Sequence, residues 1–385
     1  MSSPNSESIE RLILQHLQGF HPYHPVQPPE VLSRRAGVPP EKVIKLDSNE
    51  NPYGCSPRVR EALGQYGLYH IYPDPAHAGL REALEGYVGL GREHIVVGSG
   101  SDELIDLILR LFIEPGDKVI NCEPTFEPYR VRTDVCGGEV VVVPRDEGFA
   151  VDVDGVERAL DKATKVIFVA TPNNPSGNTT PLGDILRLVD TGRVVVVDEA
   201  YFEFCGETAA PLVARYPNLF VLRTFSKWAG LAGLRVGYGL FPTAIAQRLQ
   251  DIKLPYNVNA AAQVAGRESL KDLDHIQGTV KAILTERERL YGLLSNFFRE
   301  NMTDDEQSSV AVDLLRGLSS PVLPSRANFL LCRLGSRANE VKESLERKGI
   351  FVRYFNTPRM LDYIRITVGK PEHTDALIEA LKEIW

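Results

Sequence analysis

The fold of this chain is decided by RVVVVDEAYFEF at residues 193–204 and by LFVLRTFSKWAGLAGLRVGYG at residues 219–239. Each segment contains a run, Val194–Val197 or Leu219–Leu222, that is apolar throughout instead of alternating with polar residues. Such runs are typical of strands in a parallel sheet, because helices cover both faces of the sheet. The two segments therefore predict buried parallel strands in an α/β protein.

Reactive side chains follow each of these predicted strands. Asp198 and Tyr201 come directly after the first strand, and Thr224, Ser226 and Lys227 follow the second. In open α/β sheets, ligands bind beyond the carboxyl ends of the strands. We therefore expect a carboxylate, a phenol, two hydroxyls and an amine to converge on one edge of the sheet.

Arg235 adds a cation to this group from the far side of a glycine-rich turn. A lysine beside a hydroxyl and an arginine can bind a phosphate, and a lysine whose pKa is lowered by a neighbouring cation can react with an aldehyde. An aspartate at a strand end can hold a protonated ring nitrogen. One cofactor, pyridoxal 5'-phosphate, requires all of these groups. The residues therefore predict a pyridoxal phosphate site, and no metal site is expected.

A second anion-binding element is expected in HIVVGSGSDELIDLILRLF at 94–112, where an apolar strand runs into an amphipathic helix. The free amides at a helix N-terminus bind anions, and Gly100 lets a phosphate approach the backbone. The same pattern, with Glu123 at the end of the next strand, is also similar to a dinucleotide-binding fingerprint. Glu103 stands where that fingerprint has its third glycine, which disfavours the dinucleotide alternative.

Strands and helices alternate along the middle of the chain. EVVVVP at 139–144 and KVIFVATP at 165–172 predict further buried strands, with helical patterns at about 154–163 and 181–190. This alternation is typical of a parallel sheet with crossover helices. We therefore predict an α/β fold whose large domain has a mostly parallel mixed sheet flanked by helices.

The rest of the chain predicts an arm and a second domain. An amphipathic helix is expected from about Ser8 to Leu17, before a proline-rich run. Residues 243–300 are expected to be helical throughout and to join two domains, and a smaller α/β unit begins at about residue 322. The predicted parts are an N-terminal arm, a large cofactor-binding domain, and a small C-terminal domain with the interdomain helix, at 1–45, 46–255 and 256–385.

Composition and charge disfavour several classes of protein. The chain has 385 residues and a formal net charge of −8 without a basic run, which argues against nucleic acid as a partner. No apolar stretch is long enough to span a membrane, and the N-terminus lacks the features of a secretory signal. The five cysteines are scattered and form no CxxC pair. A reducing compartment, the cytoplasm, is therefore expected.

Several motifs resemble a known family. DEAY at 198–201 and SKWAGLAGLRVGY at 226–238 are similar to the fold type I aminotransferase superfamily, whose members use pyridoxal phosphate. Four further motifs narrow the resemblance to the histidinol-phosphate aminotransferase family: KLDSNENPYG at 45–54, YPDP at 72–75, TPNNPSG at 171–177 and YIRITVG at 363–369. The resemblance extends from about Tyr23 to the C-terminus.

The resemblance implies a role for each matching residue in the cofactor site. Lys227 would carry the cofactor, Asp198 would face its ring nitrogen, and Tyr201 and Asn174 would donate to its phenolic oxygen. Phe126 stands where the family usually has a tyrosine stacked on the ring, which keeps the ring contact but loses a hydroxyl. The residues implied at the cofactor phosphate are Gly100, Ser101, Asp102, Thr224, Ser226 and Arg235, together with Tyr53 from a second subunit.

The resemblance also implies the reaction and its partners. Lys227 would move a proton during the transamination of L-histidinol phosphate with 2-oxoglutarate, a step of histidine biosynthesis that gives imidazole-acetol phosphate and glutamate. A homodimer is implied, because Tyr53 would cross the interface. Three alternatives remain: an aromatic amino-acid aminotransferase, a threonine-phosphate decarboxylase of the same fold, and a non-catalytic cofactor-binding regulator. The implied substrate residues, whose two arginines suit a dianionic phosphate, are Tyr23, Asn328, Arg353 and Arg365.

Overall fold

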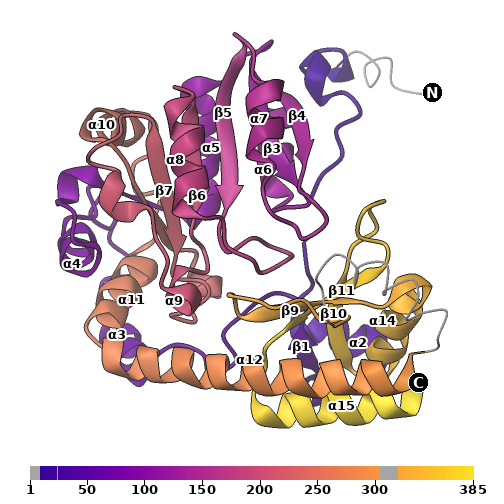
Figure 1. Ribbon diagram of the computed structural model, residues 1–385. Coiled ribbons are helices and arrows are strands. Elements are labelled where there is room, and N and C mark those ends of the chain that lie inside the picture. Colours follow the sequence, from indigo (N-terminus) through magenta and orange to yellow (C-terminus); the bar gives the residue numbers. More distant parts are fainter. Residues whose placement is uncertain (1–8, 24, 303–319) are drawn as a thin grey trace, which may run out of the picture.

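The computed structural model describes residues 9–23, 25–302 and 320–385, which form two β-sheets with helices packed around them (Figure 1). The larger sheet has the strand order β2-β8-β7-β6-β5-β3-β4, and it is parallel from β7 to β4. Strand β8 runs antiparallel to both of its neighbours. The predicted α/β fold with a mostly parallel mixed sheet is therefore confirmed. Its strands are β2 (Ile95–Gly98), β3 (Lys118–Glu123), β4 (Glu139–Pro144), β5 (Thr164–Ala170), β6 (Val194–Asp198), β7 (Leu219–Thr224) and β8 (Gly237–Leu240).

Both faces of the large sheet are buried, as its apolar runs predict. In β6, Val195 and Val197 pack into one hydrophobic cluster, whereas Val196 packs into a second cluster on the opposite face. The carboxyl ends of β6 and β7 point toward the smaller sheet (Figure 1). The helices around the large sheet are α5 (Ser101–Phe112), α6 (Pro128–Val135), α7 (Val153–Ala159), α8 (Leu182–Asp190) and α10 (Thr243–Ile252).

The smaller sheet combines segments from both ends of the chain. Its order is β1-β10-β11-β9, and β1 (Ile44–Leu46) runs parallel to β10 (Ile350–Tyr354). Strand β11 (Tyr363–Thr367) is antiparallel to both β10 and β9 (Phe329–Arg333). The N-terminal part of the chain therefore supplies an edge strand to a sheet built otherwise from C-terminal residues. The helices of this part are α2 (Pro29–Ala36), α14 (Ala338–Arg347) and α15 (Pro371–Ile384).

The region from 243 to 300 is helical but interrupted, so the prediction of continuous helix was wrong at the interruptions. Helix α10 is followed by α11 (Ala260–Leu270) and by the long α12 (Leu273–Asn301), which lies beside α15 (Figure 1). Pro255 cannot donate a backbone hydrogen bond within a helix, and the side chain of Asn259 caps α11. Two helices from the N-terminal part of the chain pack against α11, namely α3 (Pro57–Gln65) and α4 (Ala78–Val88).

The helix predicted from about Ser8 to Leu17 is confirmed at Ile9 and Glu10 but is wrong beyond them. Ser8 lies outside the described residues, and the chain after residues 9–10 forms turns and a single 3₁₀ turn at Gln15–Leu17. The side chains of Ile9 and Leu12 are 64% and 70% exposed. A short helix is stable in water only when its apolar face packs against another surface, and here those side chains face solvent.

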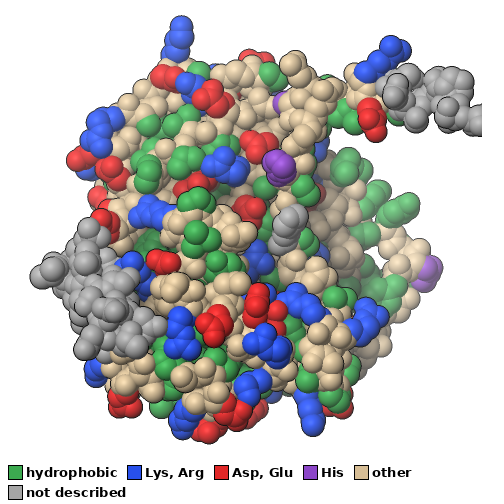
Figure 2. All heavy atoms as spheres, turned by 90° about the vertical axis from the view of Figure 1, so that its right-hand side faces the viewer, with side chains coloured by type: hydrophobic (Ala, Val, Ile, Leu, Met, Phe, Trp, Pro, Cys, Tyr) green, Lys and Arg blue, Asp and Glu red, His purple; other side chains and the backbone are tan. Residues whose placement is uncertain are grey.

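One face of the molecule carries charges of both signs. On the face drawn in Figure 2, acidic and basic side chains of the described residues are intermixed. Across the described ranges, no helix is both long enough and apolar enough to cross a lipid bilayer.

Candidate active site

Lys227 lies in the turn that follows β7, at the carboxyl edge of the large sheet. Its Nζ donates to the carbonyl oxygen of Ser48 at 2.9 Å. Burial, and after it the positive charge of Arg365, lowers the pKa of Lys227 to about 8. A larger fraction of this amine is therefore unprotonated near neutral pH than of an ordinary lysine. Both its position and its pKa suit an amine that reacts with an aldehyde.

Asp198 ends β6, the strand beside β7, and its side chain is buried. The hydroxyl of Tyr129 donates to Oδ2 at 2.6 Å, and the backbone amide of Ala200 donates to Oδ1 at 3.0 Å. Burial raises the pKa of Asp198 to about 6. A buried carboxylate is costly unless it is paired, so this position favours a cationic partner such as a protonated ring nitrogen.

Tyr129 is a site residue that sequence analysis missed. It lies in the first turn of α6, it is 1% exposed, and it stacks on Phe168 with the ring centroids 4.5 Å apart. Phe126, which was predicted at the cofactor ring, meets Tyr129 edge to face with centroids 5.4 Å apart. The signal in the sequence was an aromatic residue early in the helix after β3. Its contact with Asp198 depends on how α6 packs on the sheet.

Tyr201 and Asn174 face the site from two neighbouring strand ends, after β6 and β5. The phenol oxygen of Tyr201 accepts a hydrogen bond from Nδ2 of Asn49 at 2.8 Å. Burial raises the pKa of Tyr201 to about 12, so the phenol keeps its hydrogen at neutral pH. Oδ1 of Asn174 accepts a hydrogen bond from Nη1 of Arg365, which leaves the amide nitrogen of Asn174 to donate to a ligand.

Arg365 brings the smaller sheet into the site. It lies in β11, it is 5% exposed, and its Nη2 donates to the carbonyl oxygen of Asp47 at 2.6 Å. Arg353 lies opposite it on β10. The guanidinium of Arg365 is 5.3 Å and 5.7 Å from the ring centroids of Phe329 and Phe355. Burial lowers the pKa of Arg365 to about 10, so an anionic ligand would be strongly favoured here.

Residues 47–49, which follow β1, connect the two sheets at this point, and sequence analysis did not predict their contacts. Their three carbonyl oxygens accept hydrogen bonds from Arg365, Lys227 and Asn328, in that order. The side chain of Asn49 also reaches Tyr201. The KLDSNENPYG motif marked this segment in the sequence. The motif could not show the partners of the segment, because they are distant along the chain. This segment therefore joins the reactive amine to the anion-binding guanidinium.

The residues predicted at a phosphate gather at the N-terminus of α5. Gly100 precedes Ser101 with a φ of +79°, and a Cβ at Gly100 would lie 2.5 Å from Nη2 of Arg235. That same nitrogen of Arg235 donates to Oδ2 of Asp102 at 2.7 Å. A helix N-terminus with a guanidinium beside it is a site for a phosphate, and glycine suits position 100 because a φ of +79° is strained for any residue that carries a side chain.

Thr224 and Ser226 lie beside that helix start. Thr224 pairs with Gly237 in the sheet, and a Cβ at Gly237 would lie 2.5 Å from the amide nitrogen of Ser101. Oγ1 of Thr224 accepts a hydrogen bond from the amide of Ser226 at 3.0 Å, and both residues are buried. Lys227 is the next residue, so the anion site and the reactive amine adjoin.

The two predicted tyrosines of the N-terminal part lie in different places. Tyr23 is close enough to Tyr201 and Arg365 for its charge to raise the pKa of both. The ring centroid of Tyr53 lies 5.7 Å from Nζ of Lys370, next to the start of α15. Within this chain, Tyr23 therefore lies near the site, whereas Tyr53 packs against the C-terminal part.

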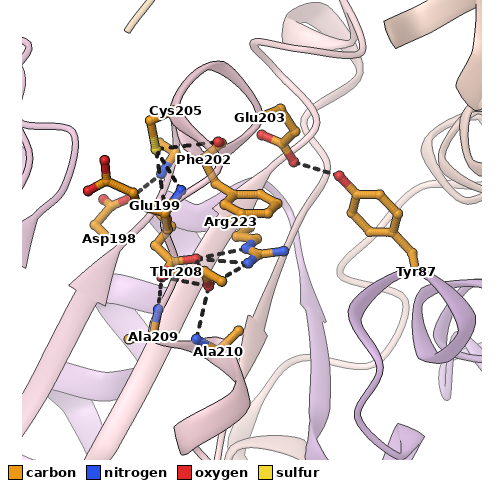
Figure 3. Close-up of polar contacts among 12 residues, drawn as sticks. Tyr87, Asp198, Glu199, Phe202, Glu203, Cys205, Thr208, Ala209, Ala210 and Arg223 are labelled. Carbon is orange, nitrogen blue, oxygen red and sulfur yellow. Dashed lines mark hydrogen bonds and ion pairs between the residues drawn. The ribbon is translucent and has the colours of Figure 1, made fainter. Parts of the chain in front are cut away.

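A buried ion pair supports the turn after β6 (Figure 3). The side chains of Glu199 and Arg223 are 0% and 3% exposed, with Nη2 of Arg223 2.9 Å from Oε2 of Glu199. The hydroxyl of Thr208 donates to Glu199, and the guanidinium lies 3.6 Å from the ring centroid of Phe202 in α9 (Phe202–Cys205). Loss of either partner would leave a buried charge unpaired, so this pair holds the ends of β6 and β7 together.

These residues fit pyridoxal phosphate. The amine, the buried carboxylate, the phenol with the amide, and the helix N-terminus with its arginine correspond to the aldehyde, ring nitrogen, phenolic oxygen and phosphate of that cofactor. Nε of Arg365 and Oδ1 of Asn328 are buried and have no hydrogen-bond partner among the residues that the structure describes. Buried polar atoms are rarely left unpaired, so these two mark a place for a polar ligand.

Proteins that are similar to this chain over nearly its whole length include two curated relatives and one solved structure. The histidinol-phosphate aminotransferase of Dehalococcoides mccartyi (strain ATCC BAA-2266 / KCTC 15142 / 195) is 46% identical over 377 residues, which cover 98% of both chains. Histidinol-phosphate aminotransferase 1, chloroplastic, of Arabidopsis thaliana is 43% identical and covers 100% of this chain and 88% of its own. The crystal structure of histidinol-phosphate aminotransferase from Sinorhizobium meliloti in complex with pyridoxal-5'-phosphate has a TM-score of 0.83 at 26% identity, covering 98% of this chain and 99% of that chain.

The family profile agrees with these relatives. The profile of the class I and II aminotransferases matches residues 41–381, a range that contains both sheets and, except for Tyr23, every predicted site residue. This chain belongs to the class I and II aminotransferases and, within them, to the histidinol-phosphate aminotransferase family.

Proposed function

We propose that this protein catalyses the pyridoxal phosphate-dependent transamination of L-histidinol phosphate with 2-oxoglutarate, which gives imidazole-acetol phosphate and glutamate in histidine biosynthesis. The observation that carries this proposal is the meeting of Lys227 and Asp198 at the ends of adjacent strands, with Arg365 of the other sheet beside them. These groups supply an amine, a partner for the ring nitrogen and a site for an anionic substrate. The family relatives support the choice of substrate.

The side chains of the site divide the chemistry between them. When bound, pyridoxal phosphate supplies an aldehyde that captures amino groups and a ring that accepts the electrons released at the substrate's α-carbon. Lys227 would hold the cofactor through its amine, and the same amine would move the proton between the substrate's α-carbon and C4′ of the cofactor. Asp198 keeps the ring nitrogen protonated, while Tyr201 and Asn174 donate to the phenolic oxygen. Phe126 would contact the face of the ring.

The phosphate of the cofactor is assigned to the start of α5. The helix dipole and the free amides there favour an anion, and Arg235 already lies against this backbone. The residues assigned to this phosphate are Gly100, Ser101, Asp102, Thr224, Ser226 and Arg235, with Tyr53 from a second subunit.

The anionic end of each substrate is assigned to Arg365, with Arg353 beside it. Two guanidinium groups suit a dianionic phosphate, and the carboxylate of 2-oxoglutarate or glutamate uses the same pocket. Tyr23 and Asn328 line this pocket; the buried, unpaired oxygen of Asn328 noted above supports that role.

Replacing Arg365 by alanine is expected to weaken both half-reactions, because histidinol phosphate and glutamate depend on the same guanidinium. Two charge-assisted hydrogen bonds of about 1.5–3 kcal/mol each predict a loss of roughly 10²–10⁴-fold in kcat/KM. Rapid-mixing measurements of each half-reaction separately test this expectation.

The comparison variant for this test is Arg353→Ala, whose loss is expected to be larger with histidinol phosphate than with glutamate. Arg347→Ala, on the exposed surface of α14, is the matched control. If Arg365→Ala turned over both substrates at the normal rate, Arg365 would not be the substrate's anion-binding residue.

The overall proposal is tested by the absorbance spectrum of the purified protein. The visible band of the bound cofactor is expected to disappear when L-histidinol phosphate donates its amino group, and to return when 2-oxoglutarate is added. Faster reaction with phenylalanine, or decarboxylation of threonine phosphate, would favour the two alternative enzymes. A yellow protein without transamination of any of these compounds would favour the regulator.

We further propose a homodimer in which Tyr53 reaches the cofactor phosphate of the other subunit. Large apolar side chains are exposed together in two neighbouring segments, and Tyr72 stacks on Tyr256 with the ring centroids 4.6 Å apart. Contiguous exposed apolar surface is typical of an interface between proteins. The exposed apolar patch consists of Leu68, Tyr69, Ile71, Tyr72, Leu254 and Tyr256.

Replacing Leu254, which is 73% exposed, by glutamate is expected to weaken this dimer at least about tenfold, because a charge would be buried in the apolar patch. Sedimentation velocity over a range of concentrations measures the change. The matched control is Leu361→Glu, which places the same charge at an exposed leucine between β10 and β11. Equal dimerisation of the wild-type and Leu254→Glu proteins would place the interface elsewhere.

We also propose that the chain divides into the arm at 1–45 and domains at 46–255 and 256–385, and that it acts in the cytoplasm. All strands of the large sheet lie between Ile95 and Leu240, which supports the first domain. Strand β1 crosses from the arm into the smaller sheet, so the division is not strict there. All five cysteines are free thiols, which supports a reducing compartment.

A further inference from the structure

Asn49 makes an unusually complete set of contacts for a loop residue. Its backbone amide donates to Oγ1 of Thr367 at 2.9 Å, and its carbonyl oxygen accepts from Nδ2 of Asn328 at 3.1 Å. Its side chain reaches Oγ1 of Thr367 at 3.1 Å and the phenol oxygen of Tyr201 at 2.8 Å. Asn49 is 1% exposed and has a φ of +55°, a left-handed conformation that asparagine adopts more readily than most residues with a side chain.

The direction of each of these hydrogen bonds follows from the donors available. The hydroxyl oxygen of Thr367 accepts from the amide of Asn49, so its own hydrogen is free to donate to Oδ1 of Asn49. That bond uses the carbonyl end of the side chain and turns Nδ2 toward Tyr201. Because Nδ2 can only donate, the phenol oxygen of Tyr201 must accept. The hydrogen of the phenol is then left for a ligand.

We propose that Asn49 is a positioning residue that directs the hydroxyl hydrogen of Tyr201 toward the bound cofactor and links this hydroxyl to Thr367 and Asn328 of the smaller sheet. The inference rests on the proposed function, in which Tyr201 donates to the phenolic oxygen of pyridoxal phosphate. Asn49 itself touches neither the reacting atoms nor the proton that Lys227 moves. It acts through Tyr201.

The hydrogen bond that the phenol oxygen of Tyr201 accepts from Asn49 also makes the phenol hydroxyl a stronger hydrogen-bond donor. The hydrogen bond from Asn49 lowers the pKa of Tyr201, against the larger effect of burial, which raises it. A stronger donor stabilises negative charge on the phenolic oxygen of the cofactor. Removing Asn49 is therefore expected to raise the pH at which the bound cofactor loses a proton and changes its absorbance.

The test uses two substitutions that tolerate the left-handed backbone. Asn49→Gly removes the side-chain amide without strain at φ +55°, and Asn49→Asp keeps the shape but offers an acceptor in place of the donor. Each variant is loaded with pyridoxal phosphate, and the absorbance is titrated against pH. The glycine variant is expected to shift the midpoint upward by about one pKa unit, since a hydrogen bond contributes about 0.5–1.5 kcal/mol. The aspartate variant is expected to shift the midpoint further upward.

A double-variant comparison separates positioning from general damage to the fold. Tyr201→Phe alone is expected to raise the midpoint, and adding Asn49→Gly to it is expected to cause no further shift, because the contribution of Asn49 passes through the missing hydroxyl. Asn218→Asp is the matched control, since its side-chain nitrogen donates to the carbonyl oxygens of Val189 and Arg193 outside the site. Its midpoint is expected to equal that of the wild type.

Different outcomes overturn different statements. The role of Asn49 would be overturned if the midpoints of Asn49→Gly and Asn49→Asp were unshifted, or if the double variant showed a full additional shift. Neither result would affect the proposed function. A wild-type protein that takes up no pyridoxal phosphate would overturn the proposed function on which it rests.

Discussion

Replacing Lys227 by alanine is expected to stop transamination, with a loss of at least about 10⁴-fold in the rate of proton transfer, the upper end of what a positioned acid–base group contributes. Lys227 both holds the cofactor and carries the proton, so this one substitution removes both functions. Single-turnover reactions of cofactor-loaded protein with histidinol phosphate measure the loss. The related variant Lys227→Arg keeps the positive charge but has no accessible neutral form, so it is expected to be equally inactive.

Hydride reduction of the cofactor-loaded protein gives an independent measurement. Reduction makes the link between amine and cofactor permanent, and peptide mapping is then expected to find the label on Lys227. Lys382→Ala, at an exposed position of α15, serves as the control and is expected to keep both label and activity. A label on any other lysine would show that Lys227 is not the reactive amine, and the assignment of the whole site would then be wrong.

The lowered pKa of Lys227 also predicts the pH dependence of cofactor uptake. Only the neutral amine attacks an aldehyde, so the rate of uptake by cofactor-free protein should rise about tenfold per pH unit below pH 8 and level off above it. The sign for stability follows from the same shift. Between about pH 8 and the ordinary lysine value of 10.5, the unfolded chain binds a proton that the folded chain does not. The stability of the cofactor-free protein should therefore rise across that window.

Replacing Asp198 by asparagine is the second large expected effect. Asparagine keeps the size of the side chain but cannot balance a positive ring nitrogen. If the ring nitrogen loses about three pKa units of stabilisation, at about 1.4 kcal/mol each, the half-reactions should slow roughly 10³-fold. Cofactor labelled with ¹⁵N reports the protonation of the ring nitrogen directly by its chemical shift, and the shift of a neutral ring is expected in Asp198→Asn.

The Asp198→Asn variant tests the charge of the carboxylate as well as the hydrogen bonds around it. Asp198→Asn can still accept from Tyr129 or Ala200, so those contacts survive in part. The control is Asp190→Asn, an exposed residue at the end of α8, which is expected to react at the wild-type rate. A protonated ring nitrogen in Asp198→Asn would show that another group supplies the negative charge.

The core of the site could be predicted because it depends on neighbours in the chain. Val194–Val197 and Leu219–Leu222 are stable only as strands covered on both faces, and the residues that follow such strands lie where ligands bind. Asp198 and Lys227 are placed by this local rule. The start of α5 follows equally from a strand that runs directly into an amphipathic helix.

Other parts of the structure were outside the reach of local patterns. The continuous helix expected over 243–300 is interrupted, and the short helix expected near the N-terminus does not continue where its apolar side chains Ile9 and Leu12 are exposed. Strand β1 joins a sheet whose other strands begin at Phe329, a pairing that depends on bringing together distant segments of the chain.

The sequence by itself therefore determined the α/β fold, the family, and the groups that follow β6 and β7. Only the tertiary structure decided which side chains position those groups. Tyr129 is 69 residues from Asp198, and Asn49 is 318 residues from Thr367. A side-chain hydrogen bond contributes only about 1 kcal/mol, so it forms where packing has already brought its partners together and leaves no periodic trace in the sequence.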